Sequence, residues 1–176
     1  MVVSLLLVWC RLVLGMVFAL SLIGKLRDIQ AFRQAIRNFR LLHGGMIGIV
    51  SVLILGGELL VVLGITLGGR WLFPAFLLAM LVLIVFSAAM ASVLARQIQT
   101  TCQCFGTSDK LVTVSDLWRN GGFLCCALSG CALTLWSPLE HTTLTMMAWF
   151  LAGVTATIFV AVWLRIGDVV ALFQSP

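Results

Sequence analysis

The sequence has very little charge for its length. Only 10% of its 176 residues are charged, with eleven basic and six acidic side chains, whereas soluble domains are about 25% charged. Hydrophobic residues make up 62% of the chain, and its mean hydropathy is +1.17. This scarcity of charge argues against an ordinary soluble domain. It predicts an all-α integral membrane protein, a bundle of helices that satisfy their own backbone in lipid.

Several motifs are also missing. The chain has no glycine-rich phosphate loop and no basic stripe interleaved with aromatic residues, so we expect no nucleic-acid partner. Its net charge of +5 and pI of about 9.2 instead suit contact with anionic lipid headgroups. The first residues lack a basic segment, and their apolar run is too long for a signal peptide. We therefore interpret this run as a retained first span.

Five apolar runs are long enough to cross a bilayer as helices. They cover residues 2–24, 44–67, 71–95, 117–137 and 146–167. Tyrosine is absent, and the six tryptophans near the ends of these runs would supply the interfacial aromatic belt. We predict a single membrane domain over residues 1–176.

Residues 28–40, between the first two spans, form an amphipathic pattern. Ile29, Phe32, Ile36 and Phe39 recur at spacings of three and four, and Asp28 can cap the helix start. The other face is basic, with Arg33, Arg37 and Arg40. This pattern predicts a helix that lies in the membrane plane.

Two charged residues, Arg11 and Glu58, stand inside apolar spans, where such residues are costly and usually paired. Counted from Lys25 and His43, both would lie roughly 21–23 Å from the same membrane face. We therefore predict an Arg11–Glu58 ion pair. It could form a proton or substrate pathway, or serve only as a structural clasp.

The longest polar interruption, residues 97–115, contains Cys102 and Cys104. Two thiols separated by one residue at the mouth of the spans suggest thiol–disulfide chemistry or binding of a soft metal. The structural alternative is that both are small buried hydrophobic residues. A disulfide across one residue would close a strained ring, and strained exposed disulfides are the more oxidising ones.

Counting spans places several polar residues on the same face as the cysteine pair. The first and third loops share that face, so Lys25, Arg119 and Asn120 would gather beside Cys102 and Cys104. Cationic neighbours and a helix N-terminus favour the nucleophilic thiolate. We predict these five residues as the catalytic group.

Motifs spread over most of the chain point to one family. They are Gly15-Met16-Val17-Phe18, the stretch from Ser21 to Asp28, Phe32, Glu58, Cys102-x-Cys104-Phe105-Gly106 and Leu117-x-Arg119-Asn120. This combination resembles the MauE proteins of methylamine utilisation, within the wider DoxX-like membrane group. The sequence departs from that family in its additional membrane cysteines, Cys10, Cys125, Cys126 and Cys131. We expect these four at different depths and poorly reactive.

The resemblance implies a thiol–disulfide oxidoreductase that supports disulfide formation outside the cytoplasm. Its partner would be a thioredoxin-fold protein of the MauD type. By analogy with DsbB and vitamin K epoxide reductase, electrons would pass to a quinone near Lys25, Phe105 and Arg119, and no metal is expected. The location would be the cytoplasmic (inner) membrane of a prokaryote.

Orientation is where two arguments conflict. The first loop carries five basic residues, and the positive-inside rule would place that face, with its cysteines, in the cytoplasm. The resemblance requires this face outside. An interfacial helix can hold arginines against headgroups on either side, so we adopt the extracytoplasmic placement.

Two other functions fit the same residues. The cysteine thiolates could bind or transport a soft metal such as the mercuric ion. Alternatively, the protein could be a structural membrane subunit whose cysteines are incidental. A mixed disulfide with a thioredoxin-fold protein would favour the oxidoreductase, and stoichiometric metal would favour the metal binder.

Overall fold

The computed structural model describes residues 2–39, 44–97, 113–136 and 145–173, and all regular elements within them are helical. Five helices are long: α1 (Val2–Arg27), α3 (Ile47–Leu67), α4 (Leu72–Ala95), α5 (Val114–Trp136) and α6 (Met146–Phe173). The shorter α2 (Ile29–Asn38) connects α1 to the 3₁₀ turn η1 (Gly44–Met46), and η2 (Gly69–Trp71) connects α3 to α4. The predicted all-α bundle is confirmed.

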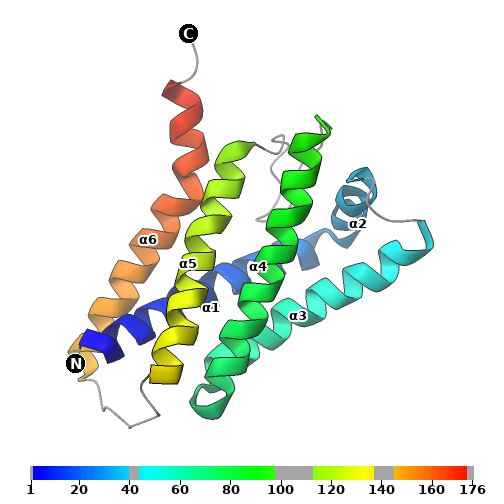
Figure 1. The fold of residues 1–176 in the computed structure, drawn as a ribbon. Helices are drawn as coiled ribbons and strands as arrows, with labels where there is room; N and C mark the ends of the chain where they lie inside the picture. Colours follow the sequence, from blue (N-terminus) through cyan, green and yellow to red (C-terminus); the bar gives the residue numbers. More distant parts are fainter. Residues whose placement is uncertain (1, 40–43, 98–112, 137–144, 174–176) are drawn as a thin grey trace.

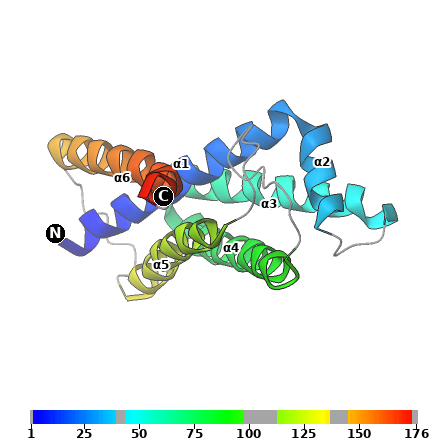
Figure 2. The ribbon, with the colours of Figure 1, turned by 90° about the horizontal axis from the view of Figure 1, so that it is seen from above.

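The long helices form two groups that cross each other (Figure 1). Helices α4 and α5 run side by side in front of α1 and α3, which cross them obliquely, and α6 lies on the other side of α1 (Figures 1 and 2). Helix α1 packs against α3, α5 and α6, and α4 packs against α3 and α5. The end of α1, α2, the end of α4 and the start of α5 share one end of the bundle, which we call the α2 end.

Four segments have the length and hydropathy of a membrane span. They are Val2–Arg27, Ile47–Leu67, Gly69–Ala95 and Met146–Arg165. Helix α5 is long enough, but Asp116, Arg119 and Asn120 near its start lower its hydropathy. The protein is an integral membrane protein, and a fifth span at α5 stays a prediction.

Small residues allow the helices to approach closely at the centre. A Cβ atom on Gly130 of α5 would lie 2.5 Å from the Phe76 ring of α4, and one on Gly64 of α3 would lie 2.8 Å from Ala75 Cβ. Close packing of this kind is typical of membrane helices, which gain little from burying apolar surface against lipid. It fixes how α4 is held between α3 and α5.

Helix α2 begins where the sequence predicts. The Asp28 side chain accepts a 2.8 Å hydrogen bond from the backbone N–H of Ala31, which caps the helix. On its apolar face, Phe32 and Ile36 are buried and pack with Ile47 of α3. These contacts pack α2 against the start of α3. That α2 lies in the membrane plane stays a prediction.

Candidate functional site

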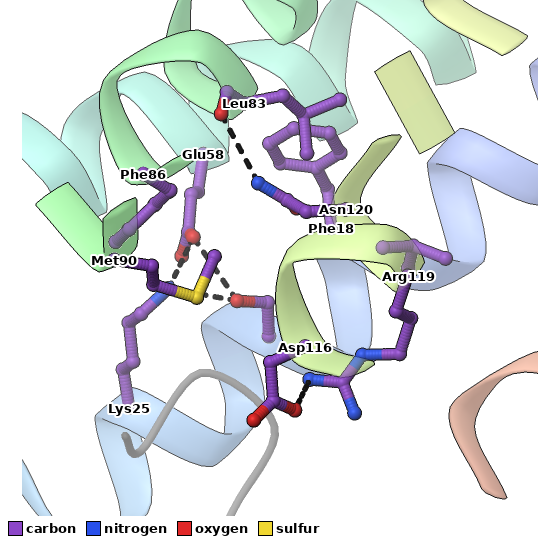
Figure 3. Close-up of a pocket in the computed structure, with 11 residues that line it drawn as sticks. Phe18, Lys25, Glu58, Leu83, Phe86, Met90, Asp116, Arg119 and Asn120 are labelled. Atoms are coloured by element: carbon purple, nitrogen blue, oxygen red, sulfur yellow. Dashed lines mark hydrogen bonds and ion pairs between the residues drawn. The ribbon is translucent and has the colours of Figure 1, made fainter. Parts of the chain in front are cut away.

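A buried ion pair joins α1 to α3 inside the bundle. The ammonium group of Lys25 donates to Glu58 Oε1, and both side chains are only 1% exposed. Ser21, one turn before Lys25 on α1, accepts a 2.7 Å hydrogen bond from Lys25 Nζ and donates a 3.0 Å bond to Glu58 Oε1. These three side chains form one connected polar cluster, of which Figure 3 labels Lys25 and Glu58.

Aromatic rings enclose the remaining side of the ammonium group. Lys25 Nζ lies 4.7 Å from the ring centroid of Phe86 on α4 and 5.5 Å from that of Phe32 on α2. Cations are attracted to aromatic faces at such distances, and more strongly where water is excluded. Lys25 is therefore held by four helices, and its positive charge is compensated without solvent.

The predicted ion pair between Arg11 and Glu58 is wrong. Arg11 instead donates a 2.7 Å hydrogen bond from Nε to the carbonyl of Ile65 and a 2.8 Å bond from Nη2 to that of Thr66. These carbonyls belong to the last turn of α3, where backbone acceptors have no partner within the helix. Arg11 is thus a cation that caps the C-terminus of α3.

The prediction failed because it placed Lys25 and His43 at the same level. Glu58 lies eleven residues after the start of α3 at Ile47, which corresponds to about 16 Å of helix. Lys25 contacts Glu58, so the end of α1 lies deep in the bundle, and α2 and η1 cover the difference in level. Only a structure shows this offset.

The start of α5 supplies a second polar group at the same end. Arg119 Nη2 lies 3.0 Å from Asp116 Oδ1, and both side chains are partly exposed. Asn120 is buried, and its side-chain nitrogen donates to the carbonyl of Leu83 at 3.1 Å and to Ser87 Oγ at 2.7 Å. Asn120 therefore fastens α5 to α4, and its predicted catalytic role is untested.

Both polar groups line one small cavity at the α2 end. It has a volume of about 30 Å³, and its polar lining comes from Ser21, Lys25, Glu58, Asp116, Arg119 and Asn120. Three of the predicted catalytic residues, Lys25, Arg119 and Asn120, are thus brought together. The apolar lining includes Leu83, Phe86 and Met90 of α4 (Figure 3).

Sequence reasoning missed two members of this site. Ser21 lies four residues before Lys25, a spacing that puts both side chains on one face of α1, so the signal was present. Phe86 gave no signal, because an aromatic residue in an apolar run is ordinary. Cys102, Cys104 and Phe105 lie outside the described residues, and their predicted roles are untested.

The sequence suggested that the four membrane cysteines lie apart from one another, but two of them lie together. Cys10 of α1 and Cys126 of α5 are buried in the same core, and their thiol groups lie close enough to interact. Cys125 is exposed on the surface of α5, and Cys131 is partly buried. The expectation of different depths is therefore wrong for Cys10 and Cys126.

With the fold and the site in view, comparison with known families gives one match. The family described as "Methylamine utilisation protein MauE" matches residues 3–137, which include α1 to α5 and the cysteine pair. The chain belongs to the MauE family. Comparisons with curated proteins and with solved structures gave no match.

The region that matches the MauE family includes the candidate site. The MauE match includes Ser21, Lys25, Glu58, Asp116, Arg119 and Asn120, so the whole polar lining of the cavity lies within the family's region. Helix α6, which packs on α1 and α5, lies beyond it. This MauE protein is a methylamine-utilisation membrane protein by family, and its chemistry is proposed below.

Proposed function

We propose that this MauE protein is a membrane thiol–disulfide oxidoreductase that uses Cys102 and Cys104. In the first step, a partner dithiol reduces the Cys102–Cys104 disulfide to two thiols and is itself oxidised to a disulfide. In the second step, the two thiols are reoxidised as a quinone takes up two electrons and two protons to become the quinol. Each cycle thus moves two electrons from the partner to the bilayer.

The observation that supports this proposal is the position of the helix ends that flank the cysteine pair. Helix α4 ends at Ala95 and α5 begins at Val114, and both lie at the α2 end (Figure 1). Met90, near the end of α4, and Asp116, in the first turn of α5, line the polar cavity. The described helix ends on either side of the Cys102–Cys104 segment therefore lie near Lys25 and Arg119, which supports the proposal.

Each cation of the site is paired with a carboxylate, and this pairing limits what each cation can do. Lys25 is neutralised by Glu58, and Arg119 by Asp116. A thiolate near this end would meet the N-terminus of α5, which attracts negative charge, and the partly exposed Arg119. Lys25, which is buried, would not contact the thiolate itself; it would hold Glu58 and Phe86 in position.

A second cavity has the size and character for the quinone. It lies between α2, α3 and α4, has a volume of about 420 Å³, and is lined almost entirely by apolar residues. Small-molecule sites usually measure about 300–1,000 Å³, so this cavity can take a ring, whereas the 30 Å³ cavity cannot. Phe86 lines both cavities, which puts the proposed acceptor one side chain from Lys25.

The partner and the orientation follow from the same proposal. A thioredoxin-fold protein would present its dithiol to the aqueous face of the α2 end. That end would lie on the extracytoplasmic side of the inner membrane of a prokaryote. In that position, the protein would support disulfide formation outside the cytoplasm. The basic face of α2 would then contact headgroups of the outer leaflet.

A coupled assay tests this function. The full-length protein in lipid nanodiscs receives a reduced thioredoxin-fold protein and a short-chain quinone, and quinol formation is followed by absorbance. We expect Cys102→Ser and Cys104→Ser to abolish electron transfer, and one of them to trap the dithiol protein as a mixed disulfide. Cys125→Ser, at a cysteine exposed on α5, is the matched control and should turn over normally. Equal rates in all variants would refute the proposal.

One observation favours the alternative of a soft-metal binder. Cys10 and Cys126 place two thiols in one part of the core, and thiolates prefer soft metals. Elemental analysis of protein dialysed against a mercuric or cuprous salt separates the two functions. Stoichiometric metal that is lost in Cys126→Ala and in Cys102→Ser, together with no electron transfer, would favour the metal binder.

A further inference from the structure

Glu58 has one carboxylate oxygen without a partner. Its Oε1 accepts hydrogen bonds from both Ser21 and Lys25, whereas Oε2 is buried and accepts none from the part of the chain that the structure describes. Buried polar atoms nearly always have a hydrogen-bond partner, and an exception points to water, an ion or a function. Glu58 Oε2 is such an exception, and it belongs to the residue that lines the polar cavity.

The cavity decides what can bind there. About 30 Å³ is room for one or two water molecules, since one requires about 10–15 Å³. An organic ligand is too large, and a quinone carbonyl would set an acceptor against an acceptor. A metal cation is disfavoured by the adjacent Lys25 ammonium. The missing group is a small hydrogen-bond donor, which means water.

We propose that Glu58 is a proton-binding site of the protein, reached through buried water at Oε2. A water in the cavity donates to Oε2 and connects it to the polar group at the start of α5. A proton that arrives from the aqueous side as hydronium converts the carboxylate to a carboxylic acid and leaves a water behind. Ser21 and Lys25 hold Oε1, so the proton binds at Oε2.

The surroundings allow Glu58 to change its charge without losing its place. Lys25 faces it from α1, and Asp116 and Arg119 face the cavity from α5, while α4 and α2 contribute only apolar side chains there. When Glu58 is protonated, Ser21 and the rings of Phe86 and Phe32 still hold the Lys25 ammonium. A purely structural clasp does not require an acceptor without a partner beside a cavity of this size. This inference does not depend on the cysteine chemistry.

The composition of the chain makes a direct test possible. Glu58 and Glu140 are its only glutamates, so Glu140→Gln leaves Glu58 as the sole glutamate. In the experiment, the full-length Glu140→Gln protein with ¹³C-carboxyl glutamate is studied in lipid bilayers by solid-state NMR. We expect one carboxyl resonance that shifts as the pH is lowered and shows a cross-peak to water protons.

Two variants make the assignment specific. Ser21→Ala removes one hydrogen bond from Oε1 and should shift the Glu58 resonance while keeping its water cross-peak. Thr155→Val removes a hydroxyl on α6 that does not line the cavity; it is the matched control and should leave the Glu58 resonance in place. A resonance that does not shift over the pH range in which the protein stays folded would overturn the proposal. A resonance without contact to water would overturn it equally. Neither result would bear on electron transfer by Cys102 and Cys104.

Discussion

Lys25 and Glu58 form an ion pair that is almost completely shielded from solvent, with Lys25 on α1 and Glu58 on α3. This pair sets the level at which the two oblique helices meet. It also places the only buried charges of the described core directly below the α2 end. The Lys25–Glu58 contact is therefore important both for the stability of the protein and for its proposed chemistry.

Breaking this pair should cost more than removing it. Lys25→Met leaves Glu58 buried without its cation, and the loss of one partner of a buried ion pair costs about 3–5 kcal/mol. The double change Lys25→Met with Glu58→Met should recover much of this loss, because two apolar side chains then pack in place of the pair. Denaturant titrations in detergent, followed by circular dichroism, measure both. Additive losses would show that the two residues are not coupled.

Arg11 should behave independently of Glu58. Arg11→Leu removes two hydrogen bonds to the last turn of α3, each worth about 1.5–3 kcal/mol for a charged donor. A double-mutant cycle with Glu58→Leu should give a coupling below about 0.5 kcal/mol, as expected for separate sites. A coupling of several kcal/mol would restore the ion pair that the sequence suggested.

Cys10 and Cys126 should cross-link in preference to other membrane cysteines. In a protein with Cys102→Ser and Cys104→Ser, a membrane-permeant oxidant should join these facing thiols, and peptide mapping would identify the bond. Cys125 points out of the bundle and should stay free, as the internal control. A Cys10→Ala variant that still loses the Cys126 thiol on oxidation would contradict the pairing.

Filling the larger cavity should affect the quinone and nothing else. Ala89 of α4 lines the 420 Å³ cavity, so Ala89→Trp should raise the KM for a short-chain quinone about tenfold or more. The reduction of Cys102–Cys104 by the dithiol partner should be unchanged. Ala91 is exposed and does not line that cavity, and Ala91→Trp is the matched control. An equal effect of both variants would remove the quinone from this cavity.

Most of the fold could be predicted, because a chain inside a lipid bilayer must satisfy its own backbone hydrogen bonds. The apolar runs had to be helices, and Asp28 with the Ile29 and Phe32 stripe marked α2. What the sequence could not reveal was the crossing of the helices. Rise per residue measures distance along one axis, whereas α1 and α3 run obliquely and start at different levels (Figure 1). This offset is why Lys25, and not Arg11, meets Glu58.

The candidate site was predicted in part for the same reason. Counting spans was enough to bring Lys25, Arg119 and Asn120 to one end, since it needs only topology. It could not show that Asn120 would fasten α5 to α4, or that Cys10 and Cys126 would face each other, because both depend on helix rotation. Nor could a sequence reveal an acceptor such as Glu58 Oε2, which is defined by a missing contact.

The proposed oxidoreductase depends on a reversible disulfide between Cys102 and Cys104. The most direct measurement is mass spectrometry of alkylated, full-length protein, prepared with and without a thioredoxin-fold dithiol as reductant. We expect a Cys102–Cys104 disulfide in the untreated protein, two alkylated thiols after reduction, and return of the disulfide when quinone is added. Free thiols under every oxidising condition, or thiols held by bound metal, would contradict it.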